Sequence, residues 1–107
     1  MDLQLQDKRV LVTGSTGGIG KKIAERYLAE GAIVYINGRN EARCRDIASE
    51  LAARSDSKGR ALAASADLSD AAQSDALLTE LETQGGVDIL INNTGIFEVK
   101  PFAEITD

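Results

Sequence analysis

The sequence lacks histidine and tryptophan, and it has one cysteine and one proline among its 107 residues. A single cysteine excludes an internal disulfide. Without histidine, a zinc site is not expected, and we predict no metal ligands. The lone Cys44 lies at helical spacing from Ile47 and Leu51. We therefore interpret Cys44 as a small buried side chain and not as a nucleophile.

Long apolar runs and basic blocks are also missing. No apolar run approaches the length of a membrane span. The net charge is −5, so nucleic-acid binding is not expected. The N-terminus has no basic segment that leads into an apolar one, so no secretion signal is visible. We predict a cytoplasmic protein that binds neither nucleic acid nor membrane, with residues 1–107 in one domain.

Strand and helix signals alternate regularly along the chain. Apolar, β-branched runs predict strands at 8–13, 33–36, 60–66 and 88–91, and helical spacing predicts helices over 18–30, 40–54 and a stretch from Ser69 or Asp70 to Gly85. Right-handed crossovers then give an α/β fold, a doubly wound parallel sheet with strand order 3-2-1-4. Ligands of such sheets bind at the carboxyl ends of the strands where the order reverses, here between the first and fourth strands.

A glycine-rich turn fills the junction between the first strand and the first helix. Residues 13–20 read Thr-Gly-Ser-Thr-Gly-Gly-Ile-Gly. Such a turn exposes backbone amides at the positive end of the helix dipole, where phosphate binds. The predicted cofactor-binding residues here are Gly14, Ser15, Thr16, Gly17, Gly18, Ile19 and Gly20. The alternative is an ordinary strand-to-helix turn.

The pattern Thr-Gly-x-x-x-Gly-Ile-Gly resembles the cofactor motif of the short-chain dehydrogenase/reductase family. The segment 92–95, Asn-Asn-Thr-Gly, is similar to the Asn-Asn-Ala-Gly motif of that family. The resemblance covers 7–107 and implies the N-terminal, Rossmann-type half of such an enzyme. It implies that Asn93, Thr94 and Gly95 line the cofactor ribose. It also implies that Asp67 binds the adenine amino group and that Leu68 packs on the ring, although an aspartate there could instead cap a helix.

The end of the second strand bears on the choice of cofactor. A site for NAD usually has an acidic residue there, which accepts hydrogen bonds from the adenosine ribose. In this sequence Gly38 occupies that position and Arg39 follows. A guanidinium pairs well with a 2′-phosphate, so we predict NADP in preference to NAD, with Arg39 as the phosphate-binding residue. The alternative is that Arg39 is a solvated surface charge.

Catalytic residues are missing from the sequence. The family uses a Tyr-x-x-x-Lys pair with a serine, but Tyr27 is followed four residues later by Gly31 and Tyr35 by Arg39. We therefore predict no catalytic residue in this chain and no activity from its 107 residues alone. The final residues, Thr106 and Asp107, are typical of a helix start, so we expect a truncated chain.

The function predicted for the full-length protein is hydride transfer between nicotinamide and a carbonyl or alcohol. The substrate is expected to be a small molecule, and the resemblance implies a homo-oligomer. The alternative is a non-catalytic dinucleotide-binding or interaction module. A sugar-nucleotide-binding protein of similar architecture is a third hypothesis, against which the glycine pattern and the segment 92–95 argue.

Overall fold

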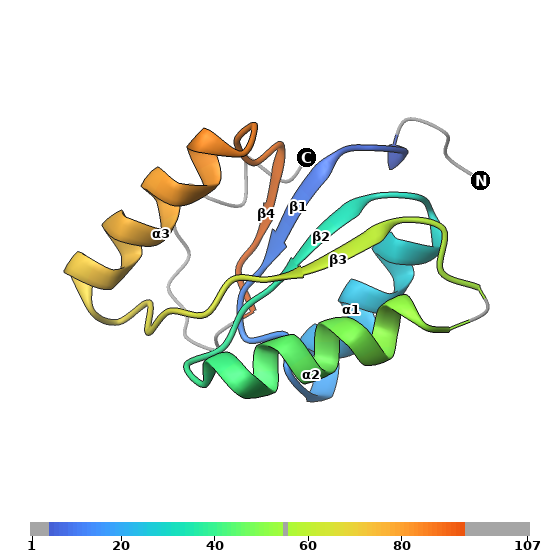
Figure 1. The fold of residues 1–107 in the computed structure, drawn as a ribbon, viewed down its shortest axis with the longest axis horizontal. Coiled ribbons are helices and arrows are strands. Elements are labelled where there is room, and N and C mark those ends of the chain that lie inside the picture. The colour runs from blue at the N-terminus through green and yellow to red at the C-terminus, as the bar shows by residue number, and fades with distance from the viewer. Residues whose placement is uncertain (1–4, 55, 94–107) are drawn as a thin grey trace.

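The computed structural model describes residues 5–54 and 56–93 (Figure 1). Strands and helices alternate along this part of the chain: β1 Arg9–Val12, α1 Gly18–Ala29, β2 Ile33–Ile36, α2 Glu41–Ala52, β3 Arg60–Ala63, α3 Ala71–Thr83 and β4 Ile89–Ile91. The strands are parallel and lie in the order β3-β2-β1-β4. The doubly wound α/β fold and the strand order predicted from the sequence are therefore confirmed.

Helices cover both faces of the sheet. In Figure 1, α1 and α2 lie on one side of the strands and α3 lies on the other. Side chains of a strand alternate between faces, so each face has its own apolar core. Val34 and Ile36 belong to the core under α1 and α2, whereas Tyr35 between them belongs to the core under α3. Burial on both faces explains why β2 is a continuous apolar run.

Helices α2 and α3 each begin at a polar residue that caps the first turn. The side chain of Asn40 accepts a hydrogen bond from the amide of Arg43 at 2.9 Å. The side chain of Asp70 accepts one from the amide of Ala72 at 2.9 Å. The sequence left Ser69 and Asp70 as alternatives for the second cap, and the structure identifies Asp70. These caps satisfy amides that have no partner inside the helix.

Strand β3 is shorter than the predicted strand at 60–66. The hydrogen bonds toward β2 nevertheless continue past its end. The amide of Ala64 donates to the carbonyl of Ile36 at 2.8 Å, and the amide of Ala66 donates to the carbonyl of Gly38 at 2.9 Å. The chain after β3 therefore stays beside the chain after β2, which brings their loops to the same edge of the sheet.

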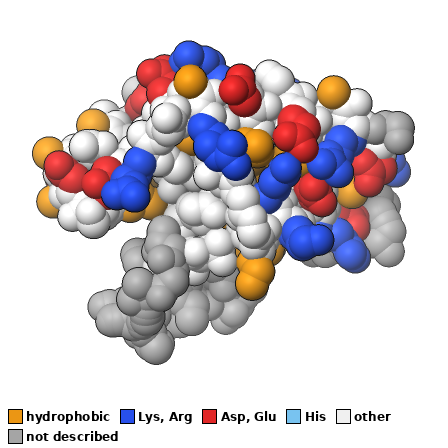
Figure 2. Space-filling model, turned by 90° about the horizontal axis from the view of Figure 1, so that it is seen from below, with side chains coloured by type: hydrophobic (Ala, Val, Ile, Leu, Met, Phe, Trp, Pro, Cys, Tyr) orange, Lys and Arg blue, Asp and Glu red, His pale blue; other side chains and the backbone are white. Residues whose placement is uncertain are grey.

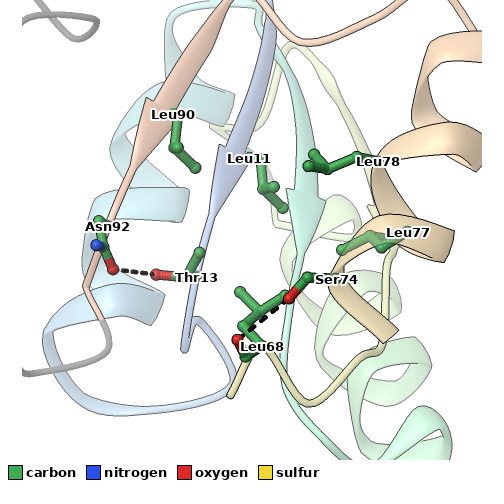
Figure 3. Close-up of a pocket in the computed structure, with 8 residues that line it drawn as sticks. All are labelled: Leu11, Thr13, Leu68, Ser74, Leu77, Leu78, Leu90 and Asn92. Atoms are coloured by element: carbon green, nitrogen blue, oxygen red, sulfur yellow. Dashed lines mark hydrogen bonds between the residues drawn. The ribbon is translucent and has the colours of Figure 1, made fainter. Parts of the chain in front are cut away.

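Two large apolar side chains on the helices are exposed. Ile19, in the first turn of α1, is 70% exposed, and Leu78 of α3 is 51% exposed. Leu78 lies at an apolar hollow of about 280 Å³ between α3 and the strands β1 and β4 (Figure 3). Leu11 and Leu90 form the sheet side of this hollow. Leu90 is only partly buried.

Cys44 is buried, as the sequence indicated. Its thiol donates a hydrogen bond to the carbonyl of Gly38 at 3.6 Å. Burial raises the pKa of the thiol above its ordinary value, so the neutral form is favoured. Within residues 5–54 and 56–93, no helix has the length and apolar character needed to cross a membrane.

Candidate functional site

The glycine turn leaves the end of β1 and enters α1 directly. Gly14 and Gly18 have φ values of +60° and +58°, in the left-handed region that favours glycine. Gly17 precedes α1 and offers no side chain, and no side chain of residues 5–54 and 56–93 caps α1. The first amides of α1 therefore lack the partner that α2 and α3 have, and they stand at the positive end of the helix dipole. Such an arrangement binds phosphate.

Gly20 lets α1 approach β1 closely. A Cβ atom on Gly20 would overlap the carbonyl oxygen of Gly14 and would lie 2.6 Å from Nδ2 of Asn93. In the structure, this Nδ2 donates a hydrogen bond to the Gly14 carbonyl at 3.4 Å. The absence of a side chain at Gly20 therefore allows the first turn of α1, the end of β1 and the segment after β4 to meet.

Asn37, the residue after β2, connects the glycine turn to the segment after β3. It is 2% exposed. Its Oδ1 accepts a hydrogen bond from the amide of Gly14 at 3.2 Å, and its Nδ2 donates to the carbonyl of Ala64 at 2.9 Å. Its backbone exchanges hydrogen bonds with Ser15: the Ser15 amide donates to the Asn37 carbonyl, and the Asn37 amide donates to the Ser15 hydroxyl, both at 2.8 Å. One buried amide thus joins the carboxyl ends of β1, β2 and β3.

Asn37 was not among the site residues predicted from the sequence. A polar residue directly after an apolar strand, at the ligand-binding edge of a parallel sheet, was the available signal. Ser15, in contrast, was predicted from the sequence to be a cofactor-binding residue. The structure turns its side chain inward, where it is fully buried. Because its amide and hydroxyl both bond to Asn37, Ser15 supports the turn from inside and does not face the ligand side.

A cleft of about 600 Å³ lies at the carboxyl edge of the sheet. It brings together residues that are far apart in the sequence, from the ends of all the strands. The lining residues are Gly14, Thr16, Asn37, Gly38, Arg39, Ala66, Asp67, Leu68, Ser69 and Asn93. Six of the predicted site residues are among them: Gly14, Thr16, Arg39, Asp67, Leu68 and Asn93. Gly17, Gly18 and Ile19 are exposed at the start of α1, and Gly20 is buried beneath it. The predicted residues Thr94 and Gly95 lie outside the described residues.

The β3 side of the cleft has a fixed carboxylate. The hydroxyl and the amide of Ser69 donate hydrogen bonds to Oδ1 of Asp67 at 2.6 and 3.0 Å. The Ser69 hydroxyl, then the Ser69 amide and the nearby charge of Arg39 hold the pKa of Asp67 below its ordinary value. Asp67 is therefore an ionised hydrogen-bond acceptor at neutral pH. Because Asp70 caps α3, Asp67 does not have the capping role that the sequence left open.

Leu68 is held in place beside Asp67. Its carbonyl accepts a hydrogen bond from the hydroxyl of Ser74 in α3 at 3.1 Å (Figure 3). Leu68 lines both the cleft and the apolar hollow beneath α3. An apolar side chain next to a fixed carboxylate suits a flat heteroaromatic ring that carries an amino group.

Thr13 joins β1 to β4 at the opposite side of the cleft. Its hydroxyl accepts a hydrogen bond from the amide of Asn93 at 2.7 Å and lies 3.3 Å from both the Ile91 carbonyl and Oδ1 of Asn92. These contacts place Asn93 where its side chain reaches the glycine turn. Thr13 was part of the motif at 13–20 but not of the predicted site.

Replacing Asn37 with alanine is expected to destabilise the protein by about 1–3 kcal/mol, because the Gly14 amide and the Ala64 carbonyl lose a buried partner. Urea unfolding measures this as a lower midpoint at unchanged slope. Asn37→Asp is the matched variant: it keeps an acceptor for Gly14 but cannot donate to Ala64, and it should also be destabilised at neutral pH. Wild-type midpoints for both variants would contradict the role assigned to Asn37.

Three comparisons place this geometry among known proteins. A family model described as short chain dehydrogenase matches residues 8–107. The chain is 46% identical over 107 residues to the uncharacterized oxidoreductase YvrD of Bacillus subtilis. That alignment covers 100% of this chain and 39% of the relative, so the chain spans about two fifths of the length of the curated protein that it matches.

Solved structures give the same result. The crystal structure of L-sorbose reductase from Gluconobacter frateurii, complexed with NADPH and L-sorbose, superimposes with a TM-score of 0.80 at 32% identity, over 92% of this chain and 37% of that one. The NADH-dependent reductase A1-R′, responsible for alginate metabolism, superimposes with a TM-score of 0.76 at 32% identity, over 89% of this chain and 38% of that one. The family model matches nearly the whole chain, and the glycine turn and the strand order agree with that match. The chain therefore belongs to the short-chain dehydrogenase family.

Proposed function

We propose that this chain is the cofactor-binding part of an NADP-dependent oxidoreductase that transfers hydride between nicotinamide and a carbonyl or alcohol. The observation that carries the proposal is the cleft itself. The glycine turn that leads into α1, a fixed carboxylate at Asp67 and the guanidinium of Arg39 meet at one opening at the carboxyl edge of a parallel sheet. NADP needs these three features for its pyrophosphate, its adenine and its 2′-phosphate respectively.

The residues fit the cofactor as follows. The amides of Gly18 and Ile19, at the exposed start of α1, face the pyrophosphate, since no side chain of the described residues caps them. Asp67 accepts a hydrogen bond from the adenine amino group, and Leu68 packs on the ring. Asn93 lines the ribose that continues toward the nicotinamide. The bound nicotinamide supplies or accepts the hydride.

The choice between NADP and NAD depends on the end of β2. The similar structures include one with NADPH and one that is NADH-dependent, so the fold alone is compatible with either cofactor. In this chain, Gly38 offers no side-chain acceptor for the ribose hydroxyls, and Arg39 lines the cleft. A guanidinium there favours a 2′-phosphate, and we therefore propose NADP as the preferred cofactor.

The catalytic residues are proposed to lie in sequence that these 107 residues do not include, because no Tyr-x-x-x-Lys pair occurs in them. The chain alone should bind the cofactor without turnover. A small-molecule carbonyl or alcohol substrate, homo-oligomer formation and a cytoplasmic location remain predictions for the full-length protein. A non-catalytic module is not favoured, since the relative and the structures named above are oxidoreductases or reductases.

Cofactor binding is tested by thermal or chemical unfolding of the purified protein with and without NADPH. A ligand that binds only the folded state at about 100 times its dissociation constant adds about 2.7 kcal/mol of stability. We expect stabilisation by NADPH, less by NADH at equal concentration, and none by nicotinamide mononucleotide. In the same samples, aldehydes and ketones should cause no NADPH oxidation by the 107-residue chain. No stabilisation by either dinucleotide would contradict the proposed function.

A further inference from the structure

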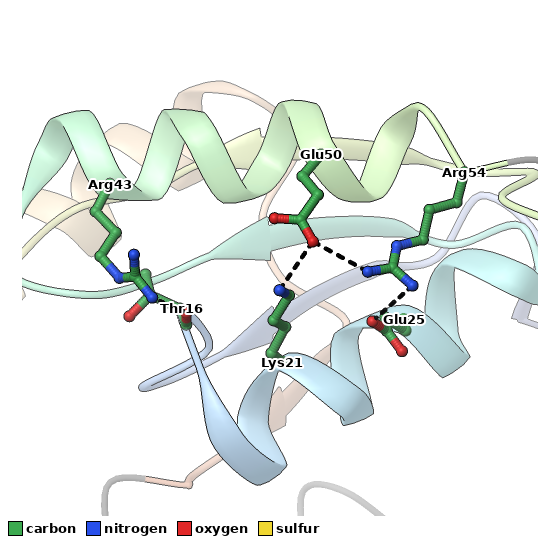
Figure 4. A network of polar contacts seen from close by, with 6 residues as sticks. All are labelled: Thr16, Lys21, Glu25, Arg43, Glu50 and Arg54. Atoms are coloured by element: carbon green, nitrogen blue, oxygen red, sulfur yellow. Dashed lines mark hydrogen bonds and ion pairs between the residues drawn. The ribbon is translucent and has the colours of Figure 1, made fainter.

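Arg43 extends from the first turn of α2 to the glycine turn (Figure 4). Its Nη2 donates a hydrogen bond to the backbone carbonyl of Thr16 at 3.1 Å. The same nitrogen lies 4.0 Å from the position that a Cβ atom on Gly17 would occupy. Its backbone is fixed by the cap, since the Arg43 amide donates to the side chain of Asn40. The guanidinium is therefore held beside the turn that receives the pyrophosphate.

Arg43 differs from its basic neighbours on the same face. Figure 2 shows Lys and Arg side chains intermixed with Asp and Glu, and no broad area of one sign. Arg45 pairs with Glu41 at 2.7 Å. Lys21 and Arg54 share Glu50, at 2.9 and 3.0 Å respectively (Figure 4). Within the part of the chain that the structure describes, Arg43 has no carboxylate partner, and its single side-chain hydrogen bond goes to a neutral carbonyl.

The location of Arg43 matters because Thr16 lies opposite the end of β2. A Cβ atom on Gly38 would lie 2.9 Å from Cγ2 of Thr16, so the Thr16 side chain approaches the Gly38 backbone closely at the cleft. The adenosine ribose must cross this narrow place, because the pyrophosphate binds at the turn and the adenine binds at Asp67. Arg39 lines the cleft on the β2 side of this place, and Arg43 reaches the Thr16 carbonyl on the turn side.

We propose that Arg43 is a second guanidinium for the 2′-phosphate of NADP and that it sets cofactor preference together with Arg39. This inference depends on the proposed function, since it requires the dinucleotide to bind in this cleft. One N–H of Arg43 stays on Thr16, and the guanidinium has further donors for phosphate oxygens. A dianionic group between two arginines is held by charge-assisted hydrogen bonds, which neutral ribose hydroxyls cannot form equally well.

The test measures dissociation constants of NADPH and NADH for the purified protein and three variants by titration calorimetry. Arg43→Gln removes the charge and keeps a donor, and Arg43→Lys keeps the charge. Arg45→Gln is the matched control, because Arg45 is on the same helix and already has a carboxylate partner. We expect Arg43→Gln to weaken NADPH binding about tenfold and to leave NADH binding unchanged. Arg43→Lys should lose less than Arg43→Gln, and Arg45→Gln should change neither constant.

The outcomes separate this inference from the proposed function. If the wild type binds neither dinucleotide, both fail. If the wild type binds NADPH but Arg43→Gln leaves both constants unchanged, Arg43 is a surface charge and the inference alone fails. If Arg43→Gln weakens NADPH and NADH equally, Arg43 only positions Thr16, and the inference again fails. A shift in NADPH affinity alone, with a smaller dependence on salt than in the wild type, supports it.

Discussion

Replacing Gly20 with alanine is expected to destabilise the protein by about 3 kcal/mol and to abolish dinucleotide binding. The added methyl group would overlap the Gly14 carbonyl and crowd Nδ2 of Asn93. Both neighbours belong to the framework of the sheet, the first as backbone at the end of β1 and the second through its hydrogen bond to that backbone. Neither can move away cheaply, so α1 must shift outward and its first amides leave the position where they meet the pyrophosphate.

Gly17→Ala adds the same methyl group to the same turn at a position that has room for it, so it is the comparison for Gly20→Ala. Gly17 has an extended backbone that any residue adopts, and only Nη2 of Arg43, at 4.0 Å, would approach its Cβ atom. We expect this variant to keep its stability within about 1 kcal/mol, the typical effect of changing a helix cap, and yet to bind NADPH weakly, because the methyl group stands on the ligand side. Urea unfolding and calorimetric titration of the two variants measure both effects. Wild-type stability and affinity in Gly20→Ala would disprove the close-packing argument.

Replacing Arg39 with aspartate is expected to change the NADPH-to-NADH preference about 100-fold toward NADH, equivalent to about 2.7 kcal/mol. The variant loses a charge-assisted hydrogen bond to the 2′-phosphate and places a like charge beside it. It also supplies the acceptor for ribose hydroxyls that Gly38 does not provide. NADPH binding should therefore weaken strongly while NADH binding weakens less or improves.

Arg45→Asp provides the control for Arg39→Asp. It changes the net charge by the same amount, but Arg45 lies on the exposed side of α2, paired with Glu41. If the loss of NADPH affinity came from the overall charge of the protein, both variants would show it, and added salt would remove it. A ratio of dissociation constants that stays the same in Arg39→Asp would mean that Arg39 does not contact the phosphate.

The fold could be predicted from the sequence because its signals are local. The apolar run of β2, the cap at Asn40 and the glycine that follows α1 each depend on a few neighbouring residues. The strand order then follows from the handedness of the crossovers. Element ends were less accurate, as β3 shows, because hydrogen bonds to the segment after β2 continue beyond Ala63, where the strand itself ends.

The site could be predicted only in part, because some of its residues contact segments that are distant in the sequence. Gly14, Arg39 and Asp67 carry motifs or stand at strand ends, and the structure brings them to one cleft. The role of Asn37 depends on three strands that end together, and the role of Arg43 depends on how α2 crosses beside the glycine turn. Neither set of contacts can be predicted from the spacing of residues along the sequence. The inward side chain of Ser15 was likewise decided by its contact with the next strand.

The open start of α1 has a consequence for the protein without its ligand. Asn40 and Asp70 complete α2 and α3 permanently, whereas nothing within the described residues completes α1 in the same way. A bound diphosphate would accept hydrogen bonds from those amides, and it would therefore cap α1 only for as long as it stays bound. Binding and local ordering would then be one event, and the first turn of α1 would exchange its amide hydrogens fastest when the cofactor is absent.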